Sequence, residues 1–201
     1  MNSFTLDNFY DNPKPIIDSF HVNGVVHFKQ FFDTALCQNI IDDILAIEEN
    51  LSASNTISLV TETIGDNIFT KYFQGLYSEG KNFKKIFCYR LLNVASLLVD
   101  STDLYFSDLE AHLRNPGGGS IPKHQDNFYF NLKYPSAVTC YIALSKQDMH
   151  NGALRYITGS HRKVINHSGS NSPGFSSCIQ DNNSEFRELK TSSIYNPIYE
   201  I

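Results

Sequence analysis

The chain of 201 residues contains no tryptophan, and its four cysteines lie far apart, with no CxxC pair. Zinc ribbons and thioredoxin-like redox sites need closely spaced cysteines, so neither class of site is indicated. We expect reduced thiols that pack in the core, at Cys37, Cys88, Cys140 and Cys178.

Dense basic runs and long apolar runs are also missing. Lys and Arg number 16 against 21 Asp and Glu, for a net charge of −5 and a pI near 5.7. Binding to a nucleic-acid backbone needs a basic stripe, so nucleic acid is not an expected partner.

The most apolar window, residues 86–99, is interrupted by Arg90 and Asn93 and is too short to span a bilayer. The N-terminus lacks the positive start and apolar run of a signal peptide. We therefore expect a cytoplasmic protein without membrane contacts.

The chain length suits a single domain over residues 1–201. A helix is predicted from near Ala35, where Asp33 and Thr34 offer N-cap oxygens. A second helix is predicted over 83–100, and strand fragments or an irregular lid over 55–79. Short strands are predicted at 24–28, 105–113, 124–129, 137–144 and 154–158, and a loop after Arg162. Helices followed by short strands predict an α+β, mainly β fold with an antiparallel barrel or sandwich.

The segment His124-Gln-Asp126 carries the strongest chemical signal. Two residues apart on a strand, the imidazole and the carboxylate point to the same face and can reach one metal ion. Such a pair is the nearer part of the two-histidine, one-carboxylate triad that holds non-haem Fe(II). A complete site of this kind needs a third ligand.

Other motifs surround this pair in a fixed order: Asn115-Pro-Gly-Gly-Gly119 before it, then Tyr141-Ile-Ala-Leu144, Asn151-Gly-Ala-Leu154 and Gly159-Ser-His-Arg162 after it. The ordered set resembles the phytanoyl-CoA dioxygenase family of Fe(II)- and 2-oxoglutarate-dependent oxygenases. The resemblance implies a double-stranded β-helix, a cupin-like jelly roll, braced by N-terminal helices. It also implies Fe(II), 2-oxoglutarate as co-substrate, O2, and a small-molecule metabolite as the substrate to be hydroxylated.

The resemblance also assigns roles to particular residues. His124 and Asp126 match the first two iron ligands. The resemblance identifies no catalytic residue beyond the metal ligands. Tyr141 matches an aromatic position beside the 2-oxoglutarate site, and we assign His112 to the same site. Tyr129 is assigned to substrate binding. Halogenating relatives carry a small residue in place of the carboxylate, so Asp126 favours hydroxylation over halogenation.

The sequence departs from the family at the distal histidine and the arginine that binds 2-oxoglutarate. After Asp126 the only histidines are His150, His161 and His167. His161 matches a histidine that is not an iron ligand in the family, and we expect it to hold a turn. We therefore expect a C-terminally incomplete domain. Two other hypotheses stay open: a catalytically inactive, truncated jelly-roll binding or interaction protein, and a cupin-like metalloenzyme that recruits His161 or His167 and does not use 2-oxoglutarate.

Overall fold

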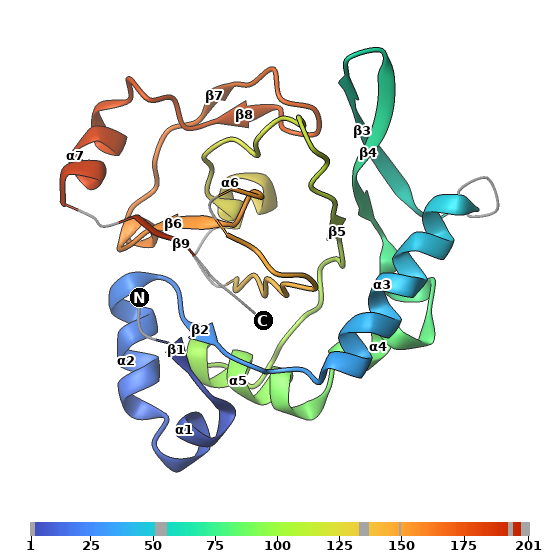
Figure 1. Ribbon diagram of the computed structural model, residues 1–201. Coiled ribbons are helices and arrows are strands. Elements are labelled where there is room, and N and C mark those ends of the chain that lie inside the picture. Colours follow the sequence, from blue (N-terminus) through green and yellow to red (C-terminus); the bar gives the residue numbers. More distant parts are fainter. Residues whose placement is uncertain (1–2, 51–55, 133–136, 149, 193–194, 198–201) are drawn as a thin grey trace. The chain divides into compact units, whose positions relative to one another are not determined.

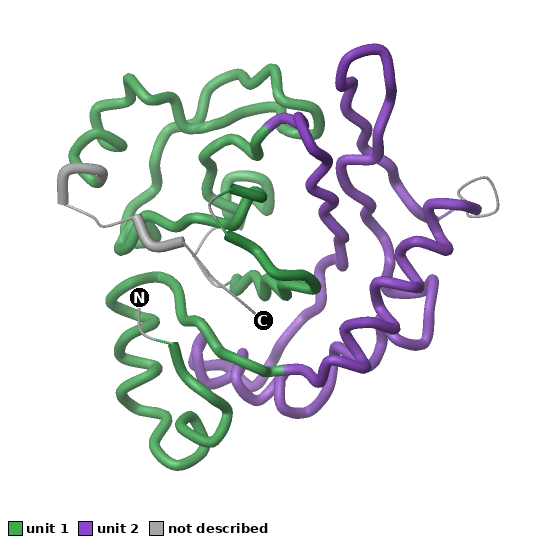
Figure 2. The backbone as a smooth tube through the Cα atoms, in the orientation of Figure 1, with its two compact units in different colours: residues 1–31, 120–201 green, residues 32–119 purple. Residues whose placement is uncertain are grey.

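The structure, a computed structural model, describes residues 3–50, 56–132, 137–148, 150–192 and 195–197 (Figure 1). The chain forms two compact units (Figure 2). Unit 1 contains residues 1–31 and 120–201, and unit 2 contains residues 32–119. The single domain over 1–201 stays a prediction.

Unit 2 begins with the long helix α3 (Thr34–Glu49), which confirms the predicted helix. The side chain of Asp33 accepts the backbone N–H of Leu36 at 2.7 Å and so caps the first turn. The predicted helix over 83–100 is divided into α4 (Lys81–Ile86) and α5 (Tyr89–Val99). Cys88 between them has an extended backbone, which lets each short helix bury its own apolar residues.

The sheet of unit 2 confirms the first of the two alternatives predicted over 55–79, which were strand fragments or an irregular lid. Strands β3 (Ser58–Ile64) and β4 (Asn67–Gln74) form an antiparallel hairpin, and β4 also pairs with β5 (Ala111–His112). Of the predicted strand 105–113, only Ala111 and His112 are in a strand. A 3-10 turn, η2 (Leu76–Ser78), follows the hairpin. The core of unit 2 includes Tyr72, Phe73, Leu76 and Phe83, all of which are buried.

Unit 1 has two short helices near the N-terminus, α1 (Leu6–Asp11) and α2 (Lys14–Asn23). Strand β1 (Ser3–Phe4) pairs in parallel with β2 (His27–Phe28), which confirms the end of the predicted strand 24–28. Further along, β6 (Arg155–Ile157) confirms the predicted strand 154–158 and pairs with β9 (Tyr195–Pro197). The 3-10 turn η3 (Ser160–Arg162) follows β6. The segment after Arg162, which was predicted as loop, contains β7 (Ser168–Gly169), β8 (Ser177–Cys178) and α7 (Ser184–Ser192).

Two predicted strands of unit 1 are wrong. Residues 126–130 form a short helix, α6 (Asp126–Phe130), and Gln125 before it is still extended. Residues 137–144 carry no strand. The described residues thus mix helices with four small sheets and do not close a barrel, so the jelly roll stays a prediction.

Two composition-based expectations are now settled in part. None of the helices in the described ranges has the length and apolarity to cross a bilayer. Cys37 is buried as expected, whereas Cys140 is exposed, so the expectation of four core thiols is wrong for that residue.

Candidate metal site

The His124 side chain is held by the backbone carbonyl of a residue close in the sequence. Its Nδ1–H donates to the carbonyl oxygen of Pro122 at 2.7 Å. Because a carbonyl only accepts, the neutral imidazole carries its proton on Nδ1, and the lone pair lies on Nε2. Nε2 lies 3.2 Å from Oδ1 of Asp126, and the two side chains are 21% and 43% exposed. The structure therefore brings together the two residues that the sequence predicted.

Asp126 reaches this position from the first turn of α6 and not from a strand. Its second carboxylate oxygen, Oδ2, accepts the hydroxyl of Thr139. The carboxylate also affects Tyr156 on β6. The pKa of the Tyr156 phenol is raised first by burial and then by the negative charge of Asp126. Thr139 and Tyr156 were not predicted to belong to the site, since contacts between separate segments leave no local pattern.

The chemistry of the pair fits two ligands of a transition metal. Imidazole nitrogen and carboxylate oxygen each bind at about 2.1 Å, so two donors at a right angle lie about 3 Å apart. The observed 3.2 Å between Nε2 and Oδ1 agrees with that requirement. Among the residues that the structure describes, however, no His, Cys, Asp or Glu joins them to make a group of three. The described residues thus fit part of an iron site.

An aromatic cluster covers the imidazole of His124. The ring centroids of Tyr129 and Phe175 lie 5.6 and 5.1 Å from it. Tyr129 donates its hydroxyl to the backbone carbonyl of Ser177, and burial raises the pKa of its phenol. Tyr129 was predicted to bind substrate and does stand beside His124. Phe175 was not predicted to belong to the site.

Gln125, between the two candidate ligands, turns its side chain toward the segment 160–167. Its Nε2 donates to the carbonyl oxygens of Ser160 and Lys163, each at 2.9 Å. Its Oε1 accepts the backbone N–H of Ile165 at 2.9 Å. The side chain of the middle residue of the motif is therefore hydrogen-bonded to the backbone of a segment about 40 residues further along the chain.

His167 uses both ring nitrogens in hydrogen bonds to the backbone. Nδ1–H donates to Ile165 at 2.8 Å, and Nε2 accepts the N–H of Gln125 at 2.9 Å. Its ring stacks on Phe128 with centroids 4.3 Å apart. Burial lowers the pKa of this imidazole and outweighs the hydrogen bond to Ile165, which raises it. His167 is thus not arranged as the third ligand.

His161 has the structural role that was expected. Its Nε2–H donates to the carbonyl of His21 at 3.0 Å, and Arg162 donates to that of Val22 at 2.7 Å. Both carbonyls belong to the last turn of α2, which is where basic side chains favourably cap a helix. Gly24, with φ of +76°, follows this turn, and a β-carbon there would clash with the His161 ring. The imidazole therefore closes a helix end.

The remaining two predicted residues, Tyr141 and His112, belong to different units. Tyr141 belongs to unit 1 and donates its hydroxyl to Gln147 at 2.7 Å. It is, with Asp126, one of the groups that raise the pKa of Tyr156. His112 belongs to unit 2, where it contacts Glu110 at 2.9 Å and stacks on Tyr72. Both assignments to the 2-oxoglutarate site stay predictions.

Comparison with known proteins gives one finding. The family model described as phytanoyl-CoA dioxygenase matches residues 20–183 of this chain. No curated protein and no solved structure matches it. The matched range contains the candidate ligands, the segment that binds Gln125, and most of both units.

Proposed function

Because the chain belongs to the phytanoyl-CoA dioxygenase family, we propose that it is an Fe(II)- and 2-oxoglutarate-dependent dioxygenase that hydroxylates a small-molecule metabolite. One observation carries the proposal: His124 Nε2 and Asp126 Oδ1 lie 3.2 Å apart, at the spacing of two ligands of one metal. The carboxylate at Asp126 supports hydroxylation over halogenation.

In this proposal His124 and Asp126 would hold the iron. The bound metal would supply the activation of O2, coupled to decarboxylation of 2-oxoglutarate to succinate. The protein's own contribution is to fix the ligands. Pro122 holds the proton on the far nitrogen of His124, and Thr139 holds the far oxygen of Asp126. Such contacts behind the ligands orient them and tune their basicity.

The aromatic cluster would serve the substrate. Tyr129 and Phe175 cover the imidazole of His124 with ring faces and edges, which limits the access of water. Tyr129 remains a protonated phenol, because its pKa is raised, and its hydroxyl already binds Ser177. We assign this cluster to apolar contact with the substrate and Tyr141 to the co-substrate.

A second candidate function belongs to a different class: a binding or interaction protein that keeps this fold without turnover. The observation that favours it is the missing third donor, since no group of three metal-binding side chains occurs in the described ranges. The two candidates differ in a measurable way, because only the oxygenase consumes 2-oxoglutarate.

The test is anaerobic addition of Fe(II) and 2-oxoglutarate to the full chain. The oxygenase predicts a weak visible charge-transfer band that His124→Ala abolishes and that His150→Ala, a change at an exposed histidine of the same unit, retains. On admission of O2, succinate should form in the unaltered chain. Absence of both band and succinate would reject the oxygenase and support the binding protein.

A further inference from the structure

His167 lies against the candidate ligands without being one of them. We propose that it is a positioning residue that sets the direction of His124 and Asp126, an inference that rests on the proposed function. The contact that carries it is the hydrogen bond from the backbone N–H of Gln125 to Nε2 of His167, at 2.9 Å.

That N–H belongs to the peptide group joining His124 to Gln125. Its plane sets ψ of His124 and φ of Gln125, the torsions closest to the point where the extended backbone passes into α6. Rotation of this one peptide would change the direction of the imidazole relative to the carboxylate. An acceptor fixed on the N–H therefore holds the 3.2 Å spacing between the ligand atoms.

The acceptor is itself fixed. Nδ1–H of His167 donates to Ile165, which assigns the proton to Nδ1 and leaves the lone pair of Nε2 for Gln125. The ring also stacks on Phe128, at an interplanar angle of 11°. Phe128 lies on α6, which Asp126 begins, so His167 holds the chain on both sides of Asp126. A histidine combines a flat ring with an acceptor at its edge, and both properties are used here.

The side chain of Gln125 strengthens the same connection. It makes three hydrogen bonds to the backbone of the segment 160–165, two as donor and one as acceptor. Through these bonds the segment that presents His167 is tied to the residue whose N–H it accepts. The ligand turn is thus held by a segment that contributes no ligand.

Two substitutions separate the acceptor from the ring. His167→Phe keeps a flat ring for stacking on Phe128 and removes the acceptor, whereas His167→Gln offers an amide oxygen as acceptor and removes the ring. His150→Phe is the matched control, at an exposed histidine of the same unit. The full-length variants are compared by Fe(II) dissociation constant under anaerobic conditions, in competition with a coloured chelator. Hydrogen exchange of the Gln125 amide is measured by NMR in the metal-free chain.

We expect His167→Phe to bind Fe(II) about 10- to 100-fold more weakly, as is typical when a group that orients a ligand is lost. Its Gln125 amide should exchange faster, while His167→Gln recovers most of the affinity and of the amide protection. His167→Phe with unchanged affinity and amide protection would overturn the proposal. Equal losses in both variants would overturn it as well, because the ring alone would then matter.

Two further readouts keep the test decisive. If His167→Phe does not fold, long-range proton–nitrogen NMR of the unaltered chain tests the proposal instead, because it shows which ring nitrogen of His167 carries the proton. A proton on Nδ1 supports the proposal, and a proton on Nε2 overturns it. If the unaltered chain does not bind Fe(II), the proposed function fails, whereas the Gln125 amide exchange still tests the positioning by itself.

Discussion

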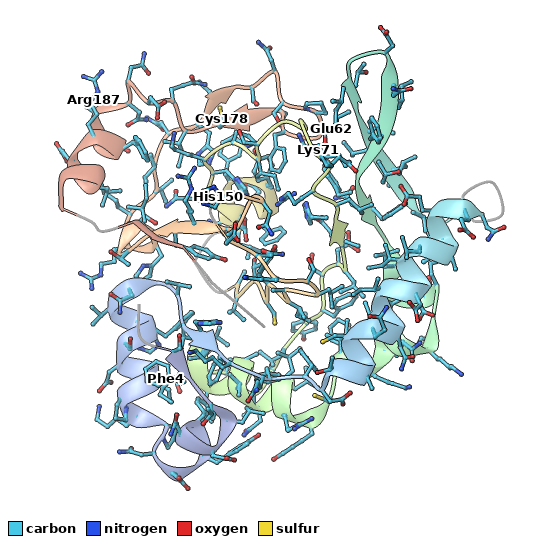
Figure 3. All side chains as sticks on the ribbon, viewed as in Figure 1. Phe4, Glu62, Lys71, His150, Cys178 and Arg187 are labelled. Atoms are coloured by element: carbon cyan, nitrogen blue, oxygen red, sulfur yellow. The ribbon has the colours of Figure 1, made fainter. Side chains whose placement is uncertain are left out.

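Two close pairs of ionisable side chains, one from each unit, differ in their surroundings. In unit 2, Lys71 Nζ lies 3.4 Å from Glu62 Oε2, with side chains only 1% and 6% exposed (Figure 3). Glu62 also accepts the N–H of Gly119 at 2.9 Å. In unit 1, His124 and Asp126 lie at a similar separation, but they are 21% and 43% exposed.

The difference distinguishes a structural pair in unit 2 from the pair in unit 1 that we propose as metal ligands. Removing one partner of a buried ion pair leaves an uncompensated charge and is costly, so we expect the loss of Lys71 alone to destabilise unit 2. An exposed pair contributes little to stability, about 0–1 kcal/mol. Nevertheless, the far atoms of His124 and Asp126 are held by Pro122 and Thr139, while the near atoms face each other. That arrangement is typical of ligands oriented for a metal.

The largest effect is expected for Asp126→Ala. Loss of the carboxylate should lower succinate formation by at least about a thousandfold, since a bound metal supplies several kcal/mol to catalysis. The free energy of unfolding should change by less than about 1 kcal/mol, because the side chain is 43% exposed. Turnover assays and urea unfolding measure the two quantities. A large loss of stability would make this pair structural, like that of unit 2.

Lys71→Met should give the opposite result, with stability lost. The substitution leaves the Glu62 carboxylate buried without its ammonium partner, at an expected cost of about 3–5 kcal/mol in urea unfolding. The double variant Lys71→Met with Glu62→Gln should recover most of the loss, because the amide still accepts the Gly119 N–H without carrying a charge. Equal stability of the single variant and the unaltered chain would contradict a structural role.

Gly118→Ala tests how closely the glycine loop packs around the buried carboxylate. A β-carbon at Gly118 would lie 2.5 Å from Glu62 Oε1, and Glu62 is held in place by Lys71 and Gly119. We expect a loss of about 1–3 kcal/mol in unfolding free energy, as for overpacking. Gly169→Ala, where nothing lies within 4 Å, is the control and should change stability by less than about 0.5 kcal/mol. Similar effects of the two substitutions would show that the loop adjusts freely.

The sequence predicted features that depend on neighbouring residues. The cap at Asp33 and the helix after it are local, and so is the two-residue spacing that brings His124 and Asp126 together. The family motif at His161 also correctly indicated a structural histidine, which the structure places at the end of α2.

The contacts that hold the ligands were not predictable from neighbouring residues. The Gln125 N–H meets His167 across 42 residues, and Thr139 meets Asp126 across 13. Such contacts depend on tertiary packing, which a local sequence pattern does not reveal. His167 lies in a segment rich in Ser, Gly and Asn that was predicted as loop. In the structure, however, both nitrogens of its ring form hydrogen bonds to the backbone.

A smaller effect is expected at Thr139, whose hydroxyl binds Asp126 Oδ2. Thr139→Val removes this donor and preserves the shape of the side chain, so Fe(II) affinity should fall about tenfold. Thr139→Ser keeps the hydroxyl and should bind Fe(II) like the unaltered chain. Chelator competition measures both, and equal affinity of the valine and serine variants would show that the hydroxyl does not orient the carboxylate.

The smallest effect is confined to acid pH and concerns Glu62. Burial alone would raise the pKa of its carboxyl, but the Gly119 N–H and the Lys71 ammonium outweigh burial and lower it. The folded pKa therefore lies below the unfolded value of about 4.3. The resulting stabilisation is fully present above that unfolded value and is lost as the pH falls through the folded pKa. The stability difference between the unaltered chain and Glu62→Gln should shrink over this range in urea unfolding, whereas the exposed control Asp18→Asn should show no comparable loss. A difference that is constant down to the acid limit would mean that Glu62 does not titrate as the buried partner of Lys71.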